Sequence, residues 1–199
     1  MGNMGHRLGG DILPHPENTL QCLKSAKGLQ SHKKFRYWEF DVNETKDGEL
    51  IVFHDDSFQG KPISEWTSKD LLKNAKEESE LEIPLLSDVL EFLGDSTKPL
   101  RIEIKNLHSD TGRQKFIDMV ASARDEHGWN CKAIAWKERF RDVFPKEDRL
   151  RWSKAFEEKG LRLCRVGMHH VDLFKAHNST VGRMMFTLGL GPISKRSRR

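Results

Sequence analysis

Residues 35–56 of this 199-residue chain have the sequence FRYWEFDVNETKDGELIVFHDD, and this stretch decides the fold. Aromatic and charged residues alternate in FRYWEFDV, which is typical of a β-strand. LIVF is a second, short apolar run, and the dipeptide Asp47-Gly48 between the two runs favours the tight turn of a β-hairpin. The stretch therefore predicts a strand, a turn and a returning strand.

Glu39 and Asp41 lie two positions apart on the first of these strands, so both side chains project from the same face. Two carboxylates side by side repel each other, and binding of a divalent cation is a common reason for such a pair. The returning strand ends at His54, which brings an imidazole back toward the acids. A solvent-facing acid pair followed by a polar turn explains this stretch alone equally well.

The composition limits the class of protein. With 36% hydrophobic and 32% charged residues, the chain is polar and long enough for one domain with a sizeable core. The net charge of +4 is concentrated in the terminal KRSRR, so it does not argue for nucleic acid as a partner. We expect no membrane span, because no apolar run approaches about 18 residues. Neither a signal peptide nor the myristoylation pattern is visible at the N-terminus.

The cysteines indicate the compartment. Cys22, Cys131 and Cys164 are odd in number and follow no motif spacing. A reduced, cytoplasmic protein is the simpler interpretation.

The N-terminal segment combines His6 and Arg7 with a Gly-rich loop. Residues 1–5 are long enough only for a strand stub, and a helix is expected over about residues 20–30, with Asn18 or Thr19 as its N-cap. Histidine transfers protons near neutral pH, and the arginine fork matches phosphate oxygens. A single histidine near a terminus is nevertheless more often structural than catalytic.

Residues 100–107, LRIEIKNL, predict a second strand that carries charges on one face. Leu100, Ile102 and Ile104 share the apolar face, whereas Arg101, Glu103 and Lys105 share the other. One interpretation is a half-exposed strand with a solvated charged face. The other places Glu103 beside Glu39 and Asp41 as a third oxygen ligand, with Lys105 as a cation for an anionic substrate.

The remaining segments predict further helices and strands without a recognisable constellation of functional residues. We expect helices over about 68–75, 87–93 (with Ser87 as N-cap and Gly94 as its end), 116–123 and 148–158, and strands over 132–136 and 161–166. Residues 181–190 contain an apolar run, His169-His170 does not resemble a metal site, and residues 191–199 form a basic tail that we expect to be disordered. A single domain would then cover residues 1–190.

Six motifs in order, GHR, PENTL, WEFDV, TKDGELIVFHDD, IPLLSDVL and RIEIK, resemble the glycerophosphodiester phosphodiesterase family. The resemblance covers Gly5 to about Leu107. It implies an α/β fold of the (β/α)₈ TIM-barrel type with a β-hairpin after the second strand. It also implies metal-dependent hydrolysis of a small-molecule glycerophosphodiester to sn-glycerol 3-phosphate and an alcohol, a reaction of lipid and glycerol metabolism.

The resemblance assigns roles to seven polar residues. The matching positions are His6 and His54 as catalytic residues, Arg7 and Lys105 as substrate-binding cations, and Glu39, Asp41 and Glu103 as metal ligands. Carboxylates are hard oxygen ligands, so Mg²⁺ or Ca²⁺ is the expected cofactor.

The chain departs from the family pattern in three ways. Leu8 stands where the family usually has glycine, the first strand is cut short, and only 92 residues follow Leu107. A complete barrel needs about 250 residues, so we expect a partial barrel. An alternative to the enzyme is therefore a non-catalytic, truncated family member that acts as a binding protein. Open sheet edges also invite association, which leaves a homo-oligomer as a further expectation.

Overall fold

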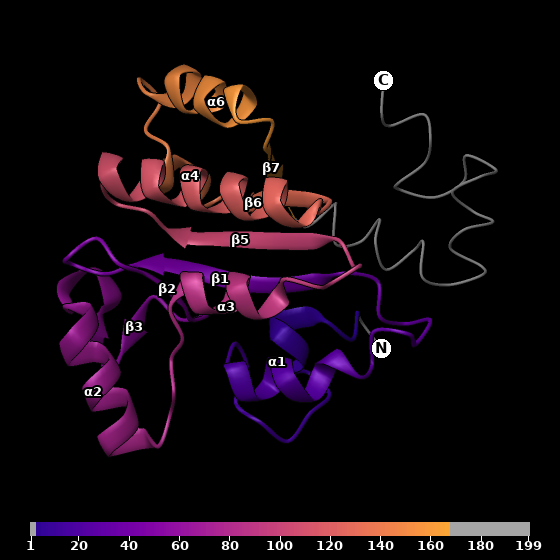
Figure 1. The fold of residues 1–199 in the computed structure, drawn as a ribbon. Helices are drawn as coiled ribbons and strands as arrows, with labels where there is room; N and C mark the ends of the chain where they lie inside the picture. Colours follow the sequence, from indigo (N-terminus) through magenta and orange to yellow (C-terminus); the bar gives the residue numbers. More distant parts are fainter. Residues whose placement is uncertain (1–2, 168–199) are drawn as a thin grey trace, which may run out of the picture.

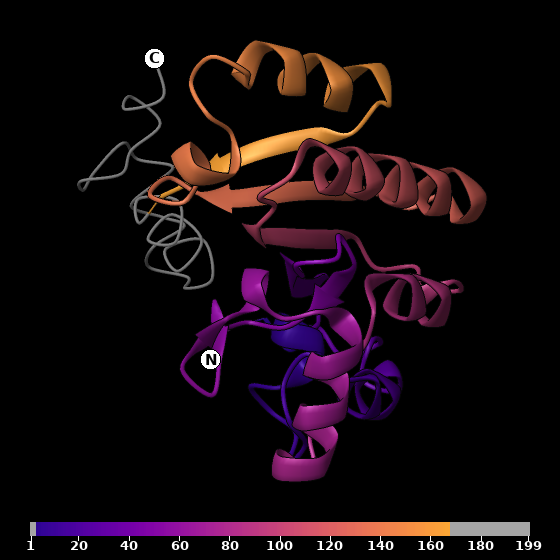
Figure 2. The ribbon, with the colours of Figure 1, turned by 90° about the vertical axis from the view of Figure 1, so that its left-hand side faces the viewer.

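The computed structural model describes residues 3–167, which are organised around one five-stranded sheet (Figures 1 and 2). The spatial order of its strands is β2-β1-β5-β6-β7. Their bounds are Trp38–Glu44 for β1, Leu50–Val52 for β2, Leu100–Asn106 for β5, Cys131–Trp136 for β6 and Arg162–Val166 for β7. Strands β1, β5, β6 and β7 are parallel, and β2 pairs with β1 in the antiparallel sense. Consecutive parallel strands with helical crossovers are the pattern of a (β/α)₈ barrel, here present in part.

The helices lie between the strands in sequence, as the alternating pattern predicts. They are α1 (Leu20–Lys27), α2 (Ser68–Ser79), α3 (Leu86–Leu93), α4 (Asp110–His127), α5 (Phe140–Val143) and α6 (Arg149–Glu158). Two short 3₁₀ helices, His6–Gly9 and Ile63–Glu65, and the two-stranded ribbon β3 (Ser57–Phe58) with β4 (Lys61–Pro62) complete the described part. Figures 1 and 2 show α4 and α6 along one side of β5, β6 and β7, with α2 at the far end of the molecule.

The alternation of apolar and polar residues along β1 and β5 correctly predicts which side chains lie in the core. Trp38, Phe40 and Val42 of β1 are fully buried together with the apolar face of β5. Burying a large apolar side chain stabilises the folded state by about 1.5–3 kcal/mol. Burial of this face therefore stabilises the packing of the sheet against its helices. A second, smaller core of six buried residues lies under α2 and includes Ile51 of β2. The segment between β2 and α3 therefore has a small core of its own.

The predicted β-hairpin is confirmed. Gly48 adopts φ 77° in the turn, and its amide donates to the carbonyl of Thr45 at 2.9 Å. The expected strand stub at the N-terminus is not confirmed, because residues 3–5 form no strand. Instead the Gly5 carbonyl accepts a hydrogen bond from the Glu39 amide at 2.8 Å, so the segment still lies against β1.

Several helix boundaries differ from the sequence-based ones. Helix α1 ends at Lys27 rather than near residue 30, and α2 continues to Ser79, beyond the expected residue 75. Ser87 is not an N-cap: α3 begins at Leu86, its N-cap position is Leu85, and no side chain caps it. The apolar run at 181–190, His169-His170 and the basic tail lie outside the described residues.

None of the helices within residues 3–167 has the length and apolar character needed to cross a membrane.

Helix α4 is longer than the expected 116–123 because it begins at a buried anchor. The Ser109 hydroxyl accepts from the Gly112 amide at 2.8 Å and donates to a carboxylate oxygen of Glu44, a fully buried residue at the end of β1. The other oxygen of Glu44 accepts from the Ser109 amide at 3.0 Å. A Cβ on Gly112 would lie 2.1 Å from the Glu44 carboxyl carbon, so only glycine permits this approach. A buried carboxylate thus joins β1 to the positive end of α4.

We predict that Glu44→Ala destabilises the protein by about 1–3 kcal/mol, because the Ser109 amide loses its buried acceptor. For a chain of this size the melting temperature should fall by roughly 3–10 °C in a thermal denaturation experiment. Glu49→Ala is the matched control, because Glu49 is a partly exposed acid whose ion pair with Lys115 lies at the surface. Equal melting temperatures for the two variants would contradict the anchoring role.

Candidate active site

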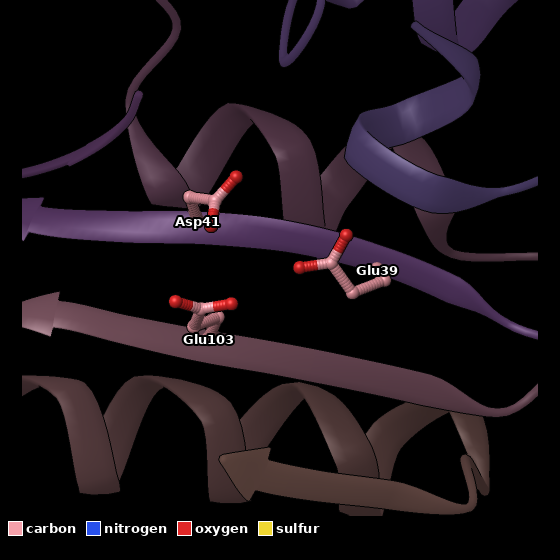
Figure 3. Close-up of side chains that lie close together, drawn as sticks. All are labelled: Glu39, Asp41 and Glu103. Atoms are coloured by element: carbon pink, nitrogen blue, oxygen red, sulfur yellow. The ribbon is translucent and has the colours of Figure 1, made fainter. Parts of the chain in front are cut away.

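Three buried carboxylates meet across β1 and β5 (Figure 3). Asp41 and Glu103 are register partners in the parallel pair, and Glu39 shares the face of Asp41 on β1. One oxygen from each carboxylate can be chosen so that all three lie within 4.8 Å of one another. The residues are only 1–7% exposed. The interpretation of these acids as solvated surface charges is therefore wrong.

The carboxylate cluster carries more negative charge than its neighbours offset. Lys105 Nζ lies 3.1 Å from Asp41 Oδ1 and 2.6 Å from Glu103 Oε1. The Glu39 carboxyl has no such contact with this ammonium, and its pKa is raised well above the ordinary value of 4.5, first by burial and then by the charge of Asp41. Mutual repulsion in a buried site is relieved by a cation, and oxygen-only donors suit a hard divalent one. The cluster thus fits a divalent metal ion.

His6 is held beside this cluster by a tightly folded loop. A Cβ on Gly5 would lie 2.3 Å from the Tyr37 carbonyl oxygen, which shows how closely this segment approaches β1. Arg7 and Leu8 both have left-handed backbones, with φ 48° and 57°, and the Leu8 side chain is fully buried in the core. His6 Nε2 consequently lies 3.5 Å from Glu39 Oε2, and His6 Nδ1 lies 2.9 Å from Asp11 Oδ2.

Arg7 links the separate parts of the site. Its Nη1 donates to both carboxylate oxygens of Glu17, at 2.9 and 2.8 Å, and its Nη2 donates to His54 Nε2 at 2.6 Å. The Arg7 amide also donates to Glu39 Oε2 at 3.0 Å. Burial opposes the guanidinium charge, but the hydrogen bond to Glu17 and the nearby acids outweigh it and raise the pKa of Arg7. This side chain remains a cation in the site.

His54 is oriented by its neighbours on both ring nitrogens. Nδ1 lies 2.7 Å from Asp55 Oδ1, and Nε2 accepts from Arg7. This pattern assigns the proton to Nδ1 in the neutral imidazole. The structure therefore brings all seven residues expected from the sequence into one region.

Sequence reasoning missed the residues that hold these groups. Asn18 donates from Nδ2 to Asp41 Oδ2 at 2.8 Å and adopts a left-handed backbone with φ 59°. Thr19, not Asn18, caps α1, since its hydroxyl accepts from the Cys22 amide. The motif PENTL contained Glu17 and Asn18, and HDD contained Asp55, so adjacency within these motifs was the available signal.

A cavity of about 460 Å³ connects these side chains. It is lined by His6, Arg7, Asp41, His54, Glu103, Lys105, Trp136, Glu138 and Arg139. Trp136 is the last residue of β6, and Glu138 and Arg139 follow it in the chain. The sequence offered no motif in this region. Arg139 Nη1 forms an ion pair with Asp56 Oδ1, which raises the pKa of Arg139 and links the loop after β6 to the loop after β2.

Comparisons with known proteins find similar sequences and similar folds. A glycerophosphodiester phosphodiesterase from Caldanaerobacter subterraneus subsp. tengcongensis is 32% identical over 114 residues, which cover 52% of this chain and 44% of that protein. The crystal structure of a glycerophosphodiester phosphodiesterase from Agrobacterium tumefaciens matches with a TM-score of 0.52 at 22% identity, covering 77% of this chain and 62% of that one. A glycerophosphoryl diester phosphodiesterase domain from Mycobacterium tuberculosis gives 0.55 at 13% identity, covering 89% and 64%.

These matches establish the fold as the TIM-barrel type, of which residues 3–167 form four parallel strands and a hairpin strand. The chain spans less than half the length of the curated relative. The model of the glycerophosphoryl diester phosphodiesterase family matches residues 6–143, more than half of the chain. By this match the chain belongs to the glycerophosphoryl diester phosphodiesterase family.

Proposed function

We propose that the protein is a metal-dependent phosphodiester hydrolase that cleaves glycerophosphodiesters to sn-glycerol 3-phosphate and an alcohol. The observation that carries the proposal is the buried carboxylate cluster beside Lys105, in a cavity that also contains both histidines. Membership of the family supports the reaction class. The reaction would serve lipid and glycerol metabolism, and we expect it in the cytoplasm.

Glu39, Asp41 and Glu103 would hold the cation, with Mg²⁺ or Ca²⁺ as the candidates that oxygen ligands favour. When bound, it supplies polarisation of the phosphoryl group and offsets negative charge. Asn18 supports this role, because its amide fixes the orientation of the Asp41 carboxylate. Glu39 is oriented in the same way by the Arg7 amide.

Arg7 and Lys105 would bind the substrate phosphate. A phosphodiester is an anion that repels nucleophiles, so charge-assisted hydrogen bonds from cations lower the barrier to attack. Both carboxylate oxygens of Glu17 hold the Arg7 guanidinium through Nη1, and Nη2 contacts His54 within the site. Lys105 is pre-positioned by Asp41 and Glu103.

His6 and His54 would exchange protons with the reacting groups. Each has Nδ1 beside a carboxylate, Asp11 for His6 and Asp55 for His54, so each presents Nε2 to the cavity side of the site. One histidine would take the proton of the attacking hydroxyl, and the other would protonate the leaving alkoxide, which otherwise leaves poorly.

The second candidate function is a non-catalytic binding protein. The observation in its favour is that residues 3–167 contain four parallel strands, whereas a complete barrel has eight. Within these residues β7 pairs on one side only, with β6, which also keeps a homo-oligomer as an expectation. Release of glycerol 3-phosphate from a glycerophosphodiester distinguishes the enzyme from the binding protein.

We predict that Mg²⁺ or Ca²⁺ stabilises the protein, and more strongly at high pH. Because the pKa of folded Glu39 is raised, metal-free protein loses stability as the pH rises from about 4.5 through that higher value. A cation displaces the proton, so its benefit grows over the same window. At a concentration near 100 times Kd the gain is about 2.7 kcal/mol, measurable as a rise in melting temperature.

The control for this experiment is Glu39→Gln/Asp41→Asn, which keeps side-chain size and removes two charges. This variant should show no cation-dependent shift and should be more stable than metal-free wild type at alkaline pH. An equal cation effect on wild type and variant would exclude this cluster as the metal site.

We predict that His54→Ala lowers kcat by about 10²–10⁴, the usual contribution of one proton-transfer group. His6→Ala should do the same, and a chelator should abolish turnover that added Mg²⁺ or Ca²⁺ restores. The assay is release of glycerol 3-phosphate from glycerophosphocholine or glycerophosphoethanolamine. His32→Ala is the control, because His32 is exposed and outside the cavity.

The outcomes separate the two proposals. Folded wild-type protein that releases no glycerol 3-phosphate from any such diester favours the binding protein. Unchanged turnover in His54→Ala would retain the activity and overturn the assignment of the site.

A further inference from the structure

We propose that Glu138 and Trp136 select diesters whose alcohol carries an ammonium group. The inference rests on the proposed function and concerns the half of the substrate that the carboxylate cluster and the phosphate-binding cations do not contact. It would make the site selective for a zwitterionic substrate over an anionic one.

The two residues belong to the cavity wall contributed by the end of β6. Trp136 is the last residue of β6 and pairs in register with Val166 of β7. It is half-buried, Glu138 is exposed, and both line the same cavity as Arg7, Lys105 and His54. An aromatic ring and a carboxylate therefore border the space next to the proposed reaction centre.

Every arginine and lysine that lines this cavity already has a carboxylate partner. The pairs are Arg7 with Glu17, Lys105 with Asp41 and Glu103, and Arg139 with Asp56. Arg139 lies next to Glu138 in the sequence, yet its ion pair is with Asp56 in the loop after β2. The ion pair of Arg139 is therefore made with Asp56 and not with Glu138.

Glu138 is the only acid lining the cavity for which no ion pair or hydrogen bond is found among residues 3–167. In the metal-loaded site, Lys105 and one divalent cation together offset the three buried carboxylates. A bound phosphodiester then adds a negative charge to a cavity where Glu138 already has one. A substrate with its own positive charge relieves this repulsion, whereas one with a neutral alcohol does not.

The chemistry of the wall matches an ammonium group. The face of an indole ring attracts cations, quaternary ammonium included, and a nearby carboxylate adds a direct charge–charge term. A neutral polyol can donate hydrogen bonds to the carboxylate, but it has no positive charge for either group to attract. We expect glycerophosphocholine to be preferred over glycerophosphoglycerol by about tenfold in kcat/KM, the combined size of a cation–π contact and a partly exposed ion pair.

The test compares these two diesters with wild type, Glu138→Gln and Trp136→Leu. Glu138→Gln keeps the side-chain size, and it should lower kcat/KM for glycerophosphocholine about fivefold while glycerophosphoglycerol changes by less than about twofold. Trp136→Leu keeps an apolar side chain and should also reduce the preference. Glu147→Gln is the matched control, since Glu147 is an exposed acid outside the cavity, and it should retain the wild-type preference.

Equal kcat/KM values for the two diesters in wild type, or an unchanged preference in Glu138→Gln, would overturn the inference. A second readout is calorimetric titration of both diesters into His54→Ala loaded with Ca²⁺, where tighter binding of the choline diester is expected. If wild type hydrolyses neither diester, the proposed function fails and wild type is titrated directly. Tighter binding of the choline diester then still supports the selectivity, and equal or absent binding refutes it.

Discussion

The repulsion among three buried carboxylates is the constraint on which the rest of the site depends. Parallel pairing of β1 with β5 puts Asp41 directly opposite Glu103, and the two-residue period of β1 adds Glu39. Burial makes this charge costly, as the raised pKa of Glu39 shows. The surroundings therefore have to supply positive charge and hydrogen-bond donors, and Lys105, Arg7 and Asn18 all do so from different parts of the chain.

Period-2 alternation explains why so much could be predicted from the sequence. In WEFDV and LRIEIK, the same alternation that puts Trp38 and Ile102 into the core puts Glu39 and Glu103 on the opposite face. Once the two strands are neighbours, the charged faces must coincide. The hairpin followed equally from local chemistry, because Asp47-Gly48 permits the positive φ that the turn requires. Local alternation thus predicted the face on which each acid lies, whereas the meeting of Glu103 with Glu39 and Asp41 depends on the pairing of β1 with β5.

Several features that the sequence did not predict depend on contacts distant in sequence. No local pattern indicates that Glu44 would anchor the start of α4 through Ser109, 65 residues away, and this contact is why the helix begins earlier than expected. The pairing of Arg139 with Asp56 spans 83 residues. Leu8 stands where the family usually has glycine, and its side chain lies in the core, where its left-handed backbone directs it. Tertiary contacts therefore determine the start of α4 and the pairing of Arg139 with Asp56.

The residues of the candidate site all come from one continuous segment of the chain. All seven expected residues come from the segment between His6 and Lys105, and the supporting groups Asp11, Glu17, Asn18 and Asp55 come from the same segment. Two parallel strands and their loops therefore assemble the charged centre. Strand β6 adds only the wall of Trp136, Glu138 and Arg139. The part of the barrel within residues 3–167 therefore contains every group that we propose as a metal ligand, phosphate-binding cation or proton carrier. Low-dielectric surroundings strengthen each electrostatic contact, so the burial of the three carboxylates increases the effect of every positive charge placed beside them.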